Sequence, residues 1–173
     1  LHGFPQTRHT WRAQVPALAE AGFRAVAPDQ RGYSPGARPD PADPGAYHVD
    51  HLVTDVVAVA DAARAEPTEG TAGGRATERF HLVGHDWGGA VAWFFAMYHP
   101  DMTERLIILN LPHPRALLRE LRENPEQQRN SGYARFFQQE GAHLGLRAEN
   151  LANWVTDPDA RERYVEAFRQ SDF

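Results

Sequence analysis

The segment from Phe80 to Gly89 (FHLVGHDWGG) constrains the fold of this chain more than any other. Its first four residues form an apolar run typical of a short buried strand, and Ala90–His99 has the composition of an apolar helix that ends before a proline. Gly84 and Gly88 flank Asp86 at a spacing of two residues on each side. Small residues at both positions allow a sharp strand-to-helix turn from which the middle side chain projects. We therefore predict a strand, a tight turn and a helix, with Asp86 at the tip of the turn.

Asp86 admits two interpretations. An Asp that precedes a helix can cap it by accepting a hydrogen bond from a backbone N–H. A reactive residue flanked by glycines between a strand and a helix is instead the arrangement called a nucleophile elbow. We favour the elbow, because a capping residue does not need glycines on both flanks. Asp86 is therefore the candidate nucleophile; its carboxylate, ionised near neutral pH, could attack saturated carbon and form an ester that water must then cleave.

Apolar runs alternate with helical patterns over the first two thirds of the chain. Besides Phe80–Val83, we expect strands that end at His2 or span Phe23–Ala27 and Leu106–Leu109, and helices over Thr10–Ala21 and Asp50–Ala65. Pro16 predicts a kink or a late start in the first of these helices. The polar, glycine-rich residues 66–77 read as an exposed loop. This alternation predicts an α/β fold, with a mostly parallel sheet flanked by helices on both faces.

The pattern changes near residue 113 from alternating strands and helices to polar, amphipathic helices. We therefore expect two parts. Residues 1–112 form a partial α/β core, and residues 113–173 form the start of an inserted helical cap.

Composition excludes several classes of function. The 173 residues carry a net charge of −5 and no basic stripe, so nucleic acid is not an expected partner. The absence of cysteine excludes thiolate catalysis and cysteine-based metal sites. The pairs His48/His51 and His81/His85 have spacings that a metal could use, but no third ligand is in register, so we predict no metal. No signal peptide or membrane span is visible in the sequence, although the chain starts without Met. We therefore expect a cytoplasmic protein and no membrane as partner.

Four motifs in order resemble the α/β-hydrolase superfamily, in the branch of the epoxide hydrolases and the related haloalkane dehalogenases: HGFP (His2–Pro5), APDQRGY (Ala27–Tyr33), GHDWGG (Gly84–Gly89) and LNLPHP (Leu109–Pro114). The resemblance implies the α/β-hydrolase fold and Asp86 as nucleophile. The backbone N–H groups of Phe4 and Trp87 would form the oxyanion hole that stabilises the charge during ester cleavage. His85 and Trp87 would line the substrate pocket. No cofactor is implied, because water and side chains suffice.

The same resemblance extends into the cap. Ser131–Gln138 is similar to the segment that bears the first of two tyrosines that hydrogen-bond the epoxide oxygen, which implies that Tyr133 donates a proton to the opening ring. The alternative is that Tyr133 is an amphipathic packing residue of the cap. We read Tyr164 as structural.

Two further residues are open to more than one interpretation. Trp87 could direct its indole N–H at a leaving group, or it could fill volume in the core. We expect Asp29 to brace its own turn beside Arg31, away from the chemistry.

The chain departs from the family pattern in the later part of the site. The family's base histidine and the acid that orients it match none of the residues present. We therefore expect an N- and C-terminally truncated fragment that is marginally stable and does not turn over alone.

Three functions remain open at this point. The first is an epoxide hydrolase that converts a small hydrophobic epoxide and water to a diol. The second is a haloalkane dehalogenase acting on an organic halide. That branch often has a halide-binding Asn where this chain has Phe4, whose side chain offers no N–H. The third is a catalytically incomplete, inert hydrolase fragment.

Overall fold

The computed structural model describes residues 1–40, 42–65 and 79–170, so the predicted loop at 66–77 lies outside the described residues. The chain divides into two compact units, Leu1–Leu111 and Pro112–Phe173. In chain order, the first unit contains η1 (Arg8–Trp11), α1 (Gln14–Glu20), η2 (Pro44–Tyr47), α2 (Val49–Ala65), β1 (Phe80–His85), α3 (Trp87–Tyr98) and β2 (Thr103–Leu109). The second contains α4 (Pro114–Glu123), α5 (Pro125–Asn130), α6 (Gly132–Phe137), η3 (Ala142–Gly145), α7 (Ala148–Leu151) and α8 (Pro158–Arg169).

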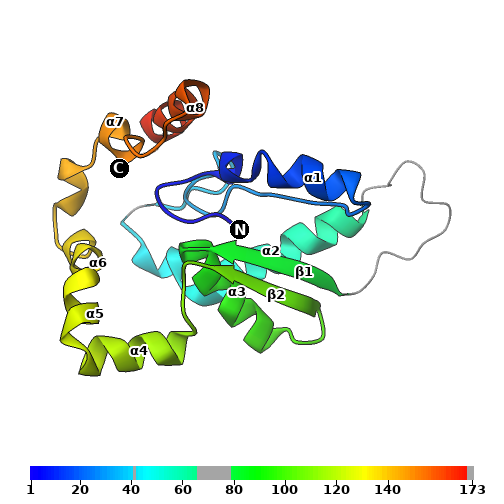
Figure 1. Ribbon diagram of the computed structural model, residues 1–173, viewed down its shortest axis with the longest axis horizontal. Helices are drawn as coiled ribbons and strands as arrows, with labels where there is room; N and C mark the ends of the chain where they lie inside the picture. The colour runs from blue at the N-terminus through cyan, green and yellow to red at the C-terminus, as the bar shows by residue number, and fades with distance from the viewer. Residues whose placement is uncertain (41, 66–78, 171–173) are drawn as a thin grey trace. The chain divides into compact units, whose positions relative to one another are not determined.

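The two strands β1 and β2 lie side by side and run parallel (Figure 1). Leu82 pairs with Leu106 and Val83 with Ile107. Parallel neighbours need a crossover connection, and α3 provides it. Both strands were expected; each is longer than predicted, because hydrogen bonding to a neighbour continues past the apolar residues that mark it in the sequence.

The N-terminal residues lie on the other side of β1. The Leu1 nitrogen donates to the Val83 carbonyl (2.6 Å), and the Leu1 carbonyl accepts from the His85 N–H (3.1 Å). This is the hydrogen-bond pattern of a parallel pair. The expected strand end therefore lies beside β1, although it is too short to be classed as a strand.

The predicted strand at Phe23–Ala27 is wrong. Within the described residues, only β1 and β2 form the sheet, and the side chains of Phe23 and Val26 are half exposed. An apolar run becomes a strand only where a neighbour accepts and donates along its backbone. The backbone groups of Leu1 are hydrogen-bonded to β1. Phe23 instead places its ring 5.9 Å from that of His81 on β1.

The helices of the first unit follow the sequence more closely. The expected helix at Asp50–Ala65 is confirmed as α2. The expected helix at Thr10–Ala21 is shorter, with η1 and α1 in its place. Pro16 lies in the first turn of α1, where its missing N–H has no intrahelical partner to lose. The late start, not the kink, is therefore the effect of this proline.

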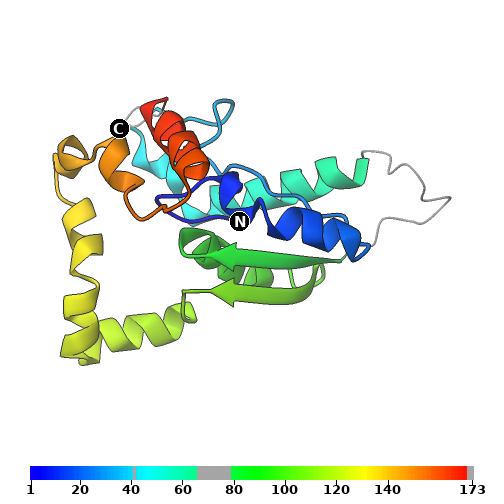
Figure 2. The ribbon, with the colours of Figure 1, turned by 45° about the horizontal axis from the view of Figure 1, so that its top comes forward.

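The helices α2 and α3 lie beside the sheet (Figure 2). One hydrophobic core joins α2, α3 and β1 in the first unit. Leu82 points into it from β1, Val53 from α2, and Val91 and Phe95 from α3. Phe95 is fully buried, with its ring 5.5 Å from that of Phe80. Since α3 begins directly after Asp86, this core fixes the direction in which the turn emerges from the sheet.

A smaller core holds the end of the second unit together. Tyr164 and Phe168 of α8 are buried and their rings stack 6.3 Å apart, while the Trp154 ring lies 5.6 Å from Tyr164. The structural reading of Tyr164 is therefore confirmed.

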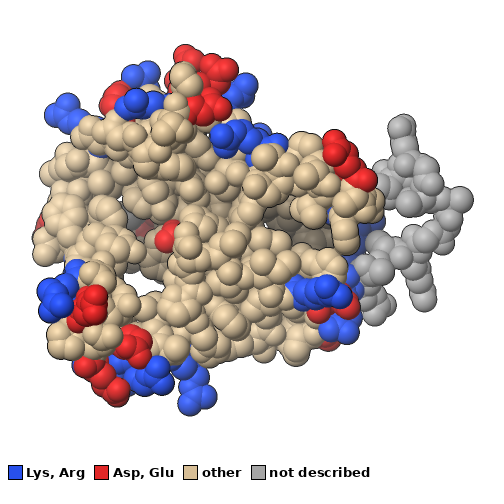
Figure 3. All heavy atoms as spheres, viewed as in Figure 1, with Lys and Arg blue, Asp and Glu red and all other residues tan. Residues whose placement is uncertain are grey.

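The molecular surface in Figure 3 carries positive and negative side chains intermixed, with no continuous basic stripe on this face. Among the described residues, no helix combines the length and the apolar character needed to cross a membrane.

Phe95 offers a test of this core. We expect Phe95→Ala to lower the free energy of unfolding by about 3–5 kcal/mol, because it leaves a cavity between α3 and β1. Met97→Ala, on the same helix but 45% exposed, should change it by no more than about 0.5 kcal/mol. Urea unfolding followed by circular dichroism measures both, and equal effects of the two substitutions would contradict the assignment of Phe95 to the core.

Candidate active site

The turn between β1 and α3 holds Asp86 in a backbone conformation that side-chain-bearing residues rarely adopt (φ 53°, ψ −123°). Several hydrogen bonds impose it. The Asp86 N–H donates to the Leu109 carbonyl (3.1 Å), and the Asp86 carbonyl accepts from Gly89 (2.8 Å) and Ala90 (3.1 Å). The end of β2 and the first turn of α3 thus fix both sides of this residue.

The Asp86 carboxylate does not cap α3. The helix has no side-chain capping bond, and Asp86 Oδ1 instead accepts from the Phe4 N–H at 2.9 Å. The capping interpretation is therefore wrong. The carboxylate turns away from its own helix toward the N-terminal HGFP turn, 82 residues away in the chain.

Three glycines make this close approach possible. A Cβ on Gly84 would lie 2.8 Å from the Gly88 carbonyl carbon, and one on Gly88 would lie 2.7 Å from the Leu1 carbonyl carbon. A Cβ on Gly3 would lie 2.8 Å from Asp86 Cγ. Real Cβ atoms do not make such contacts, so the strand, the helix and the HGFP turn can meet only where these side chains are missing.

Trp87 follows Asp86 as the first residue of α3, where a backbone N–H has no intrahelical acceptor. That position suits the predicted role of an oxyanion donor. Its side chain is 64% exposed, so the alternative that it fills core volume is wrong.

His85 lies half-buried on the other side of Asp86, and its Nε2 is 3.2 Å from the Asn110 amide nitrogen. An amide nitrogen only donates, so Nε2 is the acceptor in this contact. Asn110 itself has φ 57°, in the left-handed region that Asn tolerates better than most residues. Sequence reasoning missed Asn110; an Asn directly after a predicted strand was the available signal.

The prediction that Asp29 braces its turn beside Arg31 is wrong. Arg31 donates from Nε and one terminal nitrogen to the two carboxylate oxygens of Asp55 on α2 (2.8 and 2.7 Å). Asp29 accepts from the Arg8 backbone N–H (2.7 Å) and forms an ion pair with the Arg8 side chain (3.4 Å). Asp29 therefore ties its loop to η1, near the HGFP turn.

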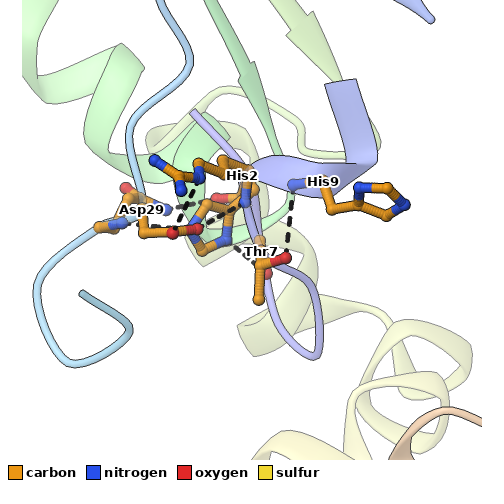
Figure 4. Close-up of polar contacts among 7 residues, drawn as sticks. His2, Thr7, His9 and Asp29 are labelled. Atoms are coloured by element: carbon orange, nitrogen blue, oxygen red, sulfur yellow. Dashed lines mark hydrogen bonds and ion pairs between the residues drawn. The ribbon is translucent and has the colours of Figure 1, made fainter. Parts of the chain in front are cut away.

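His2, the first residue of the HGFP motif, is fully buried. It lies between the loop of Asp29 and the segment with Thr7 and His9 (Figure 4). The His2 ring meets that of Tyr33 edge to face, with centroids 4.6 Å apart. Burial lowers the pKa of His2, so the ring is neutral near pH 7. Burial, together with the charge of Asp86, raises the pKa of Tyr33 and keeps its phenol neutral.

Tyr133 belongs to the second unit, on α6, where it is 63% exposed and its ring contacts that of Phe137. The first unit brings Phe4, His85 and Trp87 together around Asp86. The role of Tyr133 as a proton donor stays a prediction. Across residues 1–40, 42–65 and 79–170, no group of three or more His, Asp or Glu side chains could hold a metal ion.

The comparisons with known proteins agree with this architecture. Residues 1–172 match the Alpha/beta hydrolase family. The chain is 38% identical over 138 residues to the AB hydrolase superfamily protein YfhM of Bacillus subtilis, covering 80% of this chain and 43% of that protein. It is 43% identical over 112 residues to epoxide hydrolase B of Mycobacterium tuberculosis, covering 65% of this chain and 28% of that protein.

Two solved structures are similar to the fold of this chain. One is a mutant epoxide hydrolase from Bacillus megaterium in complex with its naphthyloxy-propanediol product, with a TM-score of 0.81 and 32% identity, covering 99% of this chain and 60% of that chain. The other is epoxide hydrolase I of potato, with a TM-score of 0.72 and 25% identity, covering 100% of this chain and 62% of that chain.

The chain therefore belongs to the alpha/beta hydrolase family, and the predicted fold class is confirmed. Its named relatives include epoxide hydrolases of bacteria and plants. The chain spans less than half the length of the two curated relatives described above.

Gly84 tests the steric basis of the turn. We expect Gly84→Ala to lower the free energy of unfolding by at least about 1–3 kcal/mol, because the new methyl group meets backbone that cannot move aside. Gly36→Ala is the matched control, since a Cβ there has no neighbour within 4 Å. Thermal unfolding compares the two, and a Gly84→Ala variant as stable as the control would refute the close approach.

Proposed function

We propose that the intact protein is an epoxide hydrolase in which Asp86 is the nucleophile. The observation that supports this most is the Asp86 carboxylate, which projects from the glycine-flanked turn and binds the Phe4 N–H instead of capping its own helix. The similarity to epoxide hydrolases from Mycobacterium tuberculosis and Bacillus megaterium supports the same conclusion.

The hydrogen bond from Phe4 distinguishes the two carboxylate oxygens. Oδ1 is held by the Phe4 N–H, so Oδ2 is the oxygen that attacks an epoxide carbon. As the new C–O bond forms, the ring C–O bond breaks and its electron pair stays on the ring oxygen. In this proposal Tyr133 gives that oxygen a proton. The product of this half-reaction is an ester of Asp86 that carries a neighbouring hydroxyl group.

Water then cleaves the ester at Asp86 Cγ. Addition of hydroxide to Cγ places a negative charge on Oδ1, which already faces the Phe4 N–H. The Trp87 N–H is the second donor in this proposal, and the two together stabilise the tetrahedral intermediate. Collapse of the intermediate releases a vicinal diol with one oxygen from the epoxide and the other from Asp86 Oδ2, and the water oxygen remains in the Asp86 carboxylate. We assign the base that activates the water to none of the nine histidines of this chain.

The substrate is proposed to be a small hydrophobic epoxide. The Bacillus megaterium relative holds a naphthyloxy-propanediol product, which has the diol that ring opening by water produces. Exposed aromatic side chains of the second unit, Tyr133, Phe136 and Phe137, offer apolar surface suited to such a group. Phe4 disfavours the haloalkane alternative, because its side chain cannot donate to a halide.

Isotope labelling tests the role of Asp86. In a single turnover in water enriched in ¹⁸O, we expect the label in the peptide that contains Asp86 and not in the diol. Asp86→Asn should lower kcat at least about 1000-fold, because a neutral amide is a poor nucleophile. Asp101→Asn, at an exposed position after α3, should leave kcat unchanged. Label that enters the diol directly, with none in the peptide, would rule out the ester.

The proton donor is tested separately. Tyr133→Phe should slow the formation of the Asp86 ester by about 100-fold, because the opening ring oxygen then lacks its acid. Tyr98→Phe, half-exposed on α3, is the control. Rapid-quench mass spectrometry follows the ester, and an unchanged rate in Tyr133→Phe would leave this tyrosine as a packing residue.

A further inference from the structure

The peptide group that links Gly3 to Phe4 is held at both ends. Its N–H donates to Asp86 Oδ1 at 2.9 Å. Its carbonyl oxygen lies 3.1 Å from Nδ1 of the buried His2 ring and also accepts from the Gln6 N–H at 3.0 Å. The proposed oxyanion donor is therefore one end of a short chain of hydrogen bonds that begins at an imidazole.

Neighbouring groups fix the tautomer of that imidazole. The Gln30 N–H donates to His2 Nε2 at 3.1 Å, so Nε2 must carry the lone pair. In the neutral ring the proton then lies on Nδ1, which donates to the Gly3 carbonyl. The Gln30 side chain holds the His2 backbone carbonyl as well, so both the ring and its backbone are anchored to the same loop residue.

We propose that His2 is a positioning residue that orients and polarises the Gly3–Phe4 peptide group, so that the Phe4 N–H is a stronger and better-placed oxyanion donor. A peptide group whose carbonyl accepts a hydrogen bond is a better donor at its N–H, because linked hydrogen bonds polarise one another. A donor fixed in advance also needs no reorganisation when charge develops on Oδ1. This inference rests on the proposed role of Asp86.

Burial makes this arrangement effective. His2 is fully enclosed, so solvent cannot replace either of its ring contacts. The edge-to-face contact with Tyr33 holds the ring plane, at 84° between the rings. A purely structural role would use the volume of the ring, whereas the proposed role uses the proton on Nδ1. The two can be separated by substitution.

Three variants of the intact protein make the comparison. His2→Phe keeps the ring volume and removes both nitrogen contacts. His2→Asn places an amide N–H near the position of Nδ1, and His2→Gln places an amide near the position of Nε2. We expect His2→Phe and His2→Gln to slow cleavage of the Asp86 ester about tenfold, a fraction of the loss seen when an oxyanion donor is removed altogether. His2→Asn should stay within about threefold of the wild type.

Nuclear magnetic resonance supplies a reading independent of turnover. In ¹⁵N-labelled wild-type protein, the His2 ring should show a protonated Nδ1 and an unprotonated Nε2. The Phe4 amide proton should move upfield in His2→Phe and remain near its wild-type position in His2→Asn. The wild-type spectrum decides the tautomer even if a variant fails to fold.

The outcomes separate the two proposals. If the wild type forms no ester on Asp86, the proposed function fails, and the ring tautomer and the Phe4 amide shift still decide whether His2 polarises the Gly3–Phe4 peptide group. If the ester forms and His2→Phe cleaves it as fast as the wild type, the inference about His2 is overturned and the function stands. A wild-type ring protonated on Nε2 would also overturn it.

Discussion

The hydrogen bond from the Phe4 N–H to Asp86 Oδ1 joins two turns that lie 82 residues apart, and the geometry of the site depends on it. It directs the carboxylate away from α3 and assigns different positions to its two oxygens. It forms only because Gly3 and Gly88 let the N-terminal segment approach the first turn of the helix. The paired end of β2, which accepts from the Asp86 N–H, completes the constraint.

Neutral groups surround this carboxylate. Burial keeps His2 uncharged by lowering its pKa, and burial with the Asp86 charge raises the pKa of Tyr33. His85 Nε2 lies on the other side of Asp86, in contact with the Asn110 amide nitrogen. In the proposed reaction the negative charge leaves the carboxylate as the ester forms and appears on Oδ1 when water adds, where the Phe4 N–H can stabilise it.

Much of the site could be predicted because its requirements are local. Gly84 and Gly88 predict the turn, since their spacing around Asp86 suits few other structures, and the HGFP motif predicts a donor near it. The strand at Phe23–Ala27 could not be predicted correctly, because an apolar run does not reveal whether a neighbour offers it hydrogen bonds. For the same reason the predicted placement of Asp29 beside Arg31 is wrong. An ion pair forms between side chains that are close in space, and here Asp29 pairs with Arg8 and Arg31 pairs with Asp55.

The amino-acid order alone determined the strand–turn–helix around Asp86 and the class of fold, because glycine spacing and apolar periodicity act over a few residues. Only the tertiary structure decided where the carboxylate points and how the Gly3–Phe4 peptide is held, and it showed that Asn110 contacts His85. These contacts join residues distant in the chain, and their geometry follows from how the backbone segments pack. Sequence spacing does not encode that packing directly.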